Sequence, residues 1–107
     1  MMARNMARAA LAAGLLAACG GKDRFSCDNG DHCVDYLYDL TADEAAESCS
    51  GEVLEGNVCE SLGEVVGMCH AEEGTPTPLA AYLFSSDYDA TTAEAWCTDG
   101  GGRFEAP

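Results

Sequence analysis

The sequence is most informative at residues 33–49, which read CVDYLYDLTADEAAESC. Over residues 34–40 apolar and acidic side chains alternate with one exception, a period-two pattern typical of a strand with one buried face. Thr41 and Glu44 then form a capping box before an alanine-rich run, in which the Thr hydroxyl accepts from the third helical N–H and the Glu reaches back. Gly51 is placed to end the helix. A strand followed directly by a capped helix predicts a mixed α and β fold.

A tight turn precedes this strand. Asn29-Gly30 is a strong hairpin signal, because both residue types suit the turns that join antiparallel strands. We therefore expect residues 25–27 to pair with residues 34–40.

The second half of the chain repeats this order of elements. Residues 64–69 and residues 79–84 are interpreted as strands on either side of a turn region at residues 74–76. The apolar spacing of the first segment also fits a helix, but Gly63 and Gly67 favour a strand.

A second capped helix follows these strands. Thr91 and Glu94 make a capping box, and Cys97 ends this helix as Cys49 ends the first. Each helix is expected to lead into a short closing strand, at residues 52–54 and 103–105. The sequence thus predicts a small disulfide-rich α+β domain, an antiparallel sheet with two short helices, built as an approximate repeat over residues 25–107. Chance or shared local physics is the alternative explanation of the repeat.

The N-terminus has the pattern of a secretory signal peptide. Residues 1–8 carry two positive charges and no acid, and residues 9–18 are a run of apolar and small side chains. A membrane-spanning helix needs about 20 apolar residues, so this run is too short for a permanent span. Residues 1–18 are therefore predicted to be removed on export.

The residues before the cleavage site indicate which peptidase acts. Leu16-Ala17-Ala18-Cys19 resembles the lipobox of bacterial lipoproteins, whereas Leu16 suits ordinary signal peptidase poorly. The resemblance implies cleavage before Cys19, a diacylglyceryl thioether on its sulfur and N-acylation of the new terminus, which together anchor the chain in a membrane. Residues 19–24 would be the lipidated tether, and Gly20 in place of Asp favours the outer membrane. A plain secreted protein is the alternative.

Six cysteines remain once Cys19 is assigned to lipid. An even number in a short exported chain predicts a disulfide framework, and a domain this small needs one because it buries little apolar surface. If equivalent cysteines of the repeat make equivalent bonds, the three disulfides are Cys27–Cys49, Cys69–Cys97 and Cys33–Cys59. The absence of a C-x-x-C motif argues against a thioredoxin-like redox site.

Several motifs follow one another in the last two-thirds of the chain: an alanine-rich helix ending at Cys49, the Gly67-Met68-Cys69 segment, aromatic Tyr82 and Phe84, and residues 91–104 ending in Gly-Gly-Arg-Phe. Together they resemble a group of small cysteine-rich lipoproteins common in myxobacteria. The residue after Gly51 departs from the aromatic pattern of that group. The resemblance implies the fold and carries no activity.

The chain is strongly acidic. From Cys19 onward three Lys or Arg residues face nineteen Asp or Glu residues, a formal charge of 3 − 19 = −16. Nucleic acids bind through Lys and Arg side chains that displace counterions, so this charge excludes nucleic acid as a partner. The acidity serves solubility on one interpretation, and on the other it attracts a basic partner or divalent cations.

Candidate metal and catalytic residues are few. His32 and His70 adjoin Cys33 and Cys69, but such adjacency lacks the ligand spacing of zinc sites, and the cysteines are expected to be oxidised. Residues 28–31 (DNGD) have calcium-type side chains without the EF-hand spacing, so a hairpin turn explains them better. We therefore predict no catalytic residue, no metal site and no cofactor.

Two features near the second helix are assigned to structure. Residues 87–89 (DYD) are interpreted as an acidic loop before the helix, and Trp96, inside the helix, is expected to lie in the core.

The predicted function is that of a lipid-anchored envelope protein, bound to the membrane through Cys19, with a non-catalytic interaction or surface-coating role. One alternative is an inhibitor or partner-binding module that presents a rigid loop at residues 71–78. Another is a small hydrolase, which would need a pocket holding two acids whose pKa values are pushed apart.

Overall fold

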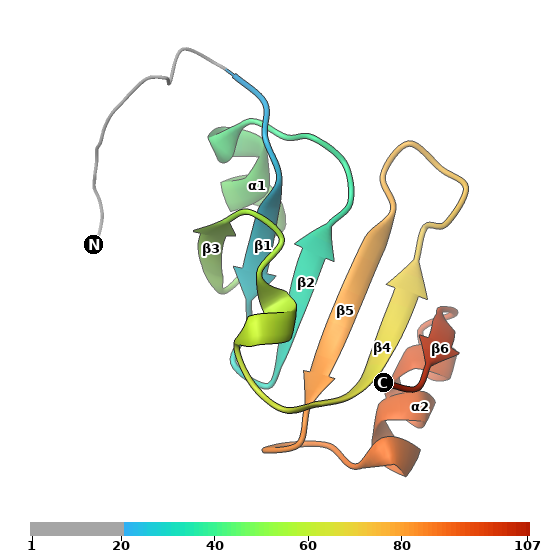
Figure 1. Cartoon of the computed structure of the whole chain (residues 1–107). Coiled ribbons are helices and arrows are strands. Elements are labelled where there is room, and N and C mark those ends of the chain that lie inside the picture. The colour runs from blue at the N-terminus through green and yellow to red at the C-terminus, as the bar shows by residue number, and fades with distance from the viewer. Residues whose placement is uncertain (1–20) are drawn as a thin grey trace.

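The computed structural model describes residues 21–107 (Figure 1). The predicted signal peptide and Cys19 lie outside the described residues. The elements of the described chain are β1 (Phe25–Asp28), β2 (His32–Tyr36), α1 (Ala42–Ser48), β3 (Glu52–Glu55), the 3-10 helix η1 (Cys59–Ser61), β4 (Val65–Ala71), β5 (Leu79–Phe84), α2 (Ala90–Asp99) and β6 (Arg103–Glu105). The predicted small α+β domain with an antiparallel sheet and two short helices is confirmed.

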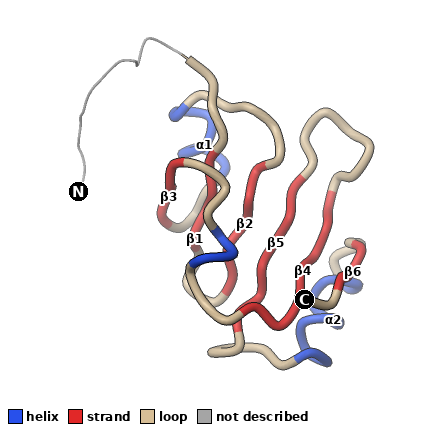
Figure 2. Tube along the Cα trace, in the orientation of Figure 1, coloured by secondary structure: helices blue, strands red, loops and turns tan. Residues whose placement is uncertain are grey.

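The strands form one sheet in the order β3-β1-β2-β5-β4-β6 (Figure 2). Every neighbouring pair is antiparallel. The first half of the chain supplies β3, β1 and β2, and the second half supplies β5, β4 and β6 in the mirrored order. The two halves are therefore related by an approximate two-fold axis between β2 and β5. This symmetry supports the predicted repeat.

The strand register locates this axis. Val34 lies opposite Cys27 in the first half, Ala81 lies opposite Cys69 in the second, and Val34 and Ala81 lie opposite each other where the halves meet. Directly opposed residues point to the same face of a sheet. One apolar row therefore crosses the whole sheet on one face: Val53, Cys27, Val34, Ala81, Cys69 and Phe104.

Both α-helices cover the face to which this row points. Helix α1 packs on β1 and buries Ala45, whereas α2 packs on β4 and β6 and buries Ala93. Figure 1 shows α1 behind the β1 end of the sheet and α2 beside the β4 end. The disulfides Cys27–Cys49 and Cys69–Cys97 join each half of the sheet to its own helix.

The segment that carries η1 covers part of the opposite face, where Cys33 of β2, Cys59 and Phe84 of β5 are buried together. The disulfide Cys33–Cys59 fastens this segment to β2. Beneath it the buried Asp35 carboxylate accepts hydrogen bonds from the Ser26 hydroxyl (2.6 Å) and from the Cys59 backbone N–H (3.3 Å). Asn57 donates from Nδ2 to the Phe25 and Tyr36 carbonyls.

The strand predicted at residues 34–40 is too long at its C-terminal end. Strand β2 ends at Tyr36, and Leu37 donates its N–H to the Pro78 carbonyl (3.0 Å). Leu40 forms an isolated bridge with Asp23 and is buried against the residues beneath α1. The alternation continues to Leu40 because that side chain also needs a buried site, although its backbone has left the strand.

The helix boundaries need two corrections. The N-cap of α2 is Asp89 rather than Thr91: its carboxylate accepts from the Thr92 N–H (2.8 Å), and the Thr92 hydroxyl accepts from the Asp89 N–H (3.0 Å). Helix α1 begins at the predicted capping box but ends at Ser48, before Gly51. A Cβ at Gly51 would collide with the Asp28 carbonyl, so close packing explains this glycine.

Candidate functional site

A shallow groove of about 330 Å³ lies on the helix-covered face, at the centre of the sheet. Helix α1 packs on β1 and α2 packs on β4 and β6, which leaves the middle of β2 and β5 incompletely covered. The groove contains both residues of the central pair, Val34 and Ala81. Its lining is Val34, Cys69, Ala71, Leu79, Ala81, Trp96, Cys97, Gly100 and Gly102.

The groove is predominantly apolar. Its floor consists of aliphatic side chains from β2, β4 and β5, and its wall consists of α2 and the glycine-rich segment after it. Val34 and Leu79 are half-buried although both lie on the helix-covered face. An apolar concave surface between packed elements is the usual form of a binding site for a small molecule or a side chain.

Trp96 was expected in the core, and this expectation is wrong. Its side chain is 39% exposed. Ala93 and Cys97 occupy the positions of α2 that face the sheet, so the neighbouring Trp96 is turned toward the edge of the helix. The indole ring packs against His32 (centroids 5.1 Å apart) and Tyr88 (6.5 Å). A partly exposed indole is thus held at one end of the groove.

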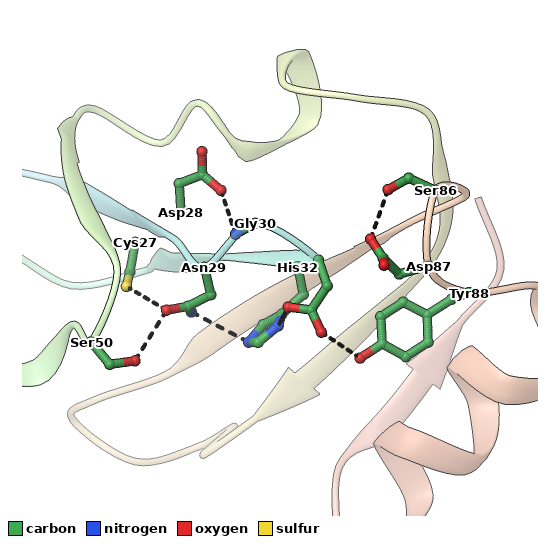
Figure 3. Close-up of polar contacts among 10 residues, drawn as sticks. Cys27, Asp28, Asn29, Gly30, His32, Ser50, Ser86, Asp87 and Tyr88 are labelled. Atoms are coloured by element: carbon green, nitrogen blue, oxygen red, sulfur yellow. Dashed lines mark hydrogen bonds and ion pairs between the residues drawn. The ribbon is translucent and has the colours of Figure 1, made fainter.

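A polar network supports this end of the groove (Figure 3). Asp31 contacts His32 Nδ1 through Oδ1 (2.7 Å) and accepts from the Tyr88 hydroxyl through Oδ2 (3.1 Å). Asn29 Nδ2 lies 3.3 Å from His32 Nε2, and Ser50 donates its hydroxyl to Asn29 Oδ1 (3.2 Å). The network therefore connects the β1–β2 turn to the ends of both helices.

The charges of the network follow from these contacts. The hydrogen bond with His32, with a further contribution from Tyr88, holds the pKa of Asp31 below its usual range. Burial, together with the hydrogen bond to Asp31, raises the pKa of the Tyr88 phenol. Asp31 is thus a carboxylate, and Tyr88 a neutral donor, throughout the neutral pH range.

The Asp31–His32 pair has two of the three parts of a nucleophilic triad. In such a triad the second imidazole nitrogen accepts the proton of a serine or cysteine. Here that nitrogen, Nε2, faces the amide of Asn29, and Ser50 lies on the far side of this amide. The arrangement positions the ring against Trp96 rather than against a nucleophile.

The six predicted cysteines form three disulfides with the connectivity expected from the repeat, Cys27–Cys49, Cys69–Cys97 and Cys33–Cys59. The Cα atoms of each pair lie 5.4–5.5 Å apart. Cys33 and Cys59 also lie close to Asp35, but thiols joined in a disulfide do not provide the thiolates of a metal site.

The two histidines lie in separate surroundings. His32 faces the groove end described above, whereas His70 Nε2 contacts Glu105 Oε1 (2.6 Å) on the other half of the sheet. The acidic stretch at residues 28–31 forms the predicted hairpin turn, in which Asp28 Oδ1 accepts from the Gly30 N–H (2.9 Å). Residues 87–89 form the loop before α2, as expected.

The loop at residues 71–78 connects β4 to β5 and is exposed from Glu72 to Thr77. A turn hydrogen bond joins the Thr75 N–H to the Glu72 carbonyl (3.2 Å). Arg103 donates two hydrogen bonds to the carboxylate of Glu73 (2.9 and 2.7 Å). The loop is therefore fastened to β6.

Within residues 21–107, neither α-helix has the length and apolar character needed to cross a bilayer. Comparisons of the chain with protein families, with curated proteins and with solved structures find no match. The likenesses to bacterial lipoproteins noted in the sequence stay predictions. Sequence reasoning missed the groove, since Val34, Ala81 and Trp96 are brought together only by the pairing of the two halves.

Proposed function

We propose that this chain is a lipid-tethered protein of the bacterial cell envelope that binds a partner and does not catalyse a reaction. The apolar groove carries the proposal, because the structure holds a partly exposed tryptophan beside half-buried aliphatic side chains. An open apolar concavity between packed elements is a common form of recognition site, which supports a binding role.

The disulfides support a location outside the cytoplasm. Three disulfides in a domain of this size are typical of proteins that fold in an oxidising compartment. They also make the groove rigid, since one of them joins the floor at Cys69 to the wall at Cys97. A preformed groove loses little conformational entropy when it binds.

The tether is proposed from the sequence around Cys19. Acyl chains on this residue would hold the domain at a membrane, because each buried CH2 contributes about 0.8 kcal/mol. The folded domain begins close to Cys19 in the sequence, because Asp23 already forms a β-bridge with Leu40. The tether between the lipid and the folded domain is therefore only a few residues long, and we place it on the outer membrane because Gly20 replaces Asp.

Fractionation tests the tether. The unaltered protein is expected in the membrane fraction, and the Cys19→Ala variant, uncleaved by the lipoprotein peptidase, is expected without acyl chains.

Affinity capture from solubilised envelope tests the interaction. Unaltered protein should retain a stoichiometric partner that a groove-filling variant, Gly100→Phe, does not retain. Equal capture by both proteins would contradict recognition through the groove.

A second candidate function is presentation of the 71–78 loop to a target, as in an inhibitor. The observation that favours it is the double hydrogen bond from Arg103 to Glu73, which holds an exposed loop in one conformation. Thr77→Lys would alter the surface of this loop without touching the groove. Loss of the partner on this substitution, with retention by Gly100→Phe, would select the loop over the groove.

A further inference from the structure

We infer that the groove binds a cationic segment of a partner protein that carries apolar side chains. This inference rests on the proposed function and specifies its partner. It follows from two independent properties of the helix-covered face: an apolar depression at the centre and uncompensated acids on the helices at its sides.

The depression selects apolar side chains. Val34, Leu79 and Ala81 form its floor, and the indole of Trp96 borders it. A volume of about 330 Å³ holds a few side chains rather than a folded surface. Trp96 is the only tryptophan of the chain, and tryptophan is among the residues most often found at energetic centres of interfaces.

The charged side chains of the two helices beside the depression are all acidic. Helix α1 reads ADEAAES and α2 reads ATTAEAWCTD, with no Lys, Arg or His in either. Their five carboxylates belong to exposed residues: Asp43, Glu44, Glu47, Glu94 and Asp99. Acids on the helices that flank an apolar surface attract a positively charged partner and repel a negatively charged one.

The basic residues of the described chain leave most of these helical acids without an ion pair. Lys22 contacts Glu44 of α1 (3.6 Å), but Arg24 contacts Asp39 and Arg103 contacts Glu73, both outside the helices. Within residues 21–107 the other four helical acids have no Lys or Arg within 4.0 Å. Their charge is available to a partner.

The same charges disfavour other occupants of the groove. A second copy would bring the formal charge of −16 that the chain carries from Cys19 onward against an equal charge. A fatty acid would find an apolar floor, but its carboxylate would add negative charge to a face whose two helices carry acids and no Lys or Arg. A segment in which Lys or Arg accompanies Leu- or Phe-type side chains satisfies both surfaces.

The fluorescence of Trp96 provides the test. The lipidated protein, held in nanodiscs of neutral phosphatidylcholine, is titrated with a short peptide in which lysine and leucine alternate. A saturable change in Trp96 emission is expected, with an affinity that falls as salt screens the charges. A glutamate–leucine peptide, a lysine–serine peptide, laurate and empty nanodiscs are the comparison titrations, and none is expected to give the saturable change.

Three variants locate the binding site. A Cβ at Gly100 would meet only ordinary contacts of 3.6 Å, so Gly100→Phe should fold and fill the groove. This variant, and the pair Glu94→Lys with Asp99→Lys, should each weaken peptide binding about tenfold. Glu60→Lys makes the same kind of charge change on the η1 side of the sheet and should bind like the unaltered protein. Circular dichroism confirms the folding of each.

The outcomes separate this inference from the proposed function. Equal binding of the glutamate–leucine peptide or of laurate would overturn the cationic partner. The cationic partner would also be overturned if Gly100→Phe abolished the capture of an envelope partner but the lysine–leucine peptide did not compete with that partner. In that case the groove would still be a binding site. If Gly100→Phe changes neither peptide binding nor envelope capture, both the inference and the groove as the carrier of function are wrong.

Discussion

At the scale of single residues, two glycines show how closely the halves correspond. Val53 and Phe104 are equivalent positions of the edge strands, and Gly51 and Gly102 each lie two residues before them. A Cβ at Gly51 would collide with the Asp28 carbonyl, and a Cβ at Gly102 would collide with Cys69 Sγ. Both glycines therefore allow the chain that leaves a helix to pass close to the first strand of its half.

Gly102→Ala tests this close approach. The added methyl group has no free space beside the Cys69–Cys97 disulfide, so the free energy of unfolding should fall by about 2 kcal/mol. Gly100→Ala is the control, because its Cβ would meet only contacts of 3.6 Å, and it should be neutral or stabilising by about 0.5 kcal/mol. Urea unfolding of the oxidised proteins measures both. Equal effects would contradict the packing at Gly102.

The polar network gives a prediction on pH. The hydrogen bond with His32 lowers the pKa of Asp31 most, and Tyr88 adds to it, so Tyr88→Phe should raise this pKa toward its usual value. A lowered pKa in the folded state stabilises the protein above about pH 4, and this contribution is lost as the pH falls through the folded-state pKa. NMR titration of the Asp31 carboxyl carbon measures the shift. No change in Tyr88→Phe would remove Tyr88 from the network.

Some of these residue roles can be read from sequence and others cannot. The capping residues Thr41 and Glu44 act within one turn of helix, so local spacing identifies them. The role of Trp96 depends on which side of α2 meets the sheet, and a helix with few large apolar side chains does not reveal that side. Ala93 and Cys97 pack the interface in place of the larger residue.

At the scale of elements, each helix is short and depends on its cap and its disulfide. Helix α1 spans seven residues and α2 ten, lengths at which an isolated helix is not stable in water. Each begins with a reciprocal cap and is tied to the sheet through Cys49 or Cys97. The groove wall on α2 therefore depends on both ends of that helix.

Substitutions at the start of α2 distinguish the observed cap from the one that the sequence suggested. Asp89→Ala removes the carboxylate that accepts from the Thr92 N–H, and it should lower the free energy of unfolding by about 1 kcal/mol. Thr91→Ala changes an exposed residue inside the helix and should have almost no effect. Denaturant unfolding measures both. A larger loss in Thr91→Ala would restore Thr91 as the cap.

The sequence allows either cap, since Thr91-x-x-Glu94 fits the capping box and Asp89 is itself a residue type preferred at the N-cap. The structure selects Asp89 because the Tyr88 ring, one residue earlier, packs against Trp96 and its hydroxyl bonds to Asp31. This long-range contact fixes where the loop ends. The predicted end of the strand at residues 34–40 is wrong for a related reason. Strand β2 stops at Tyr36, and Leu37 donates its N–H to the carbonyl of Pro78, which lies 41 positions further along the chain.

At the scale of the whole molecule, the two-fold arrangement explains both the cysteine pairing and the place of the groove. Equivalent bonds join each first strand to its own helix, and the groove lies where the two halves meet. The third disulfide breaks the symmetry, because it fastens η1 to β2 and has no counterpart among residues 65–107. The pairing could be predicted because it needs only the repeat. The groove could not, because it needs the register of β2 against β5.

The third disulfide gives a prediction at this scale. Replacing Cys33 and Cys59 together by Ala should lower the free energy of unfolding by about 3 kcal/mol, since the bond closes a loop with a sequence separation of 26. Proteolysis should then begin in the η1 segment, while the fluorescence of Trp96 on the other face stays unchanged. A cleavage pattern identical to that of the unaltered protein would contradict the fastening role.

The central claim is that one cysteine carries lipid and the other six are all joined in three disulfides. Intact-mass spectrometry of the protein extracted from its native membrane, alkylated without reduction, tests both parts at once. The account predicts a chain that begins at Cys19, is heavier by its acyl groups and carries no alkylated thiol. A chain that still begins at Met1, without acyl groups and with its cysteines alkylated, would contradict it.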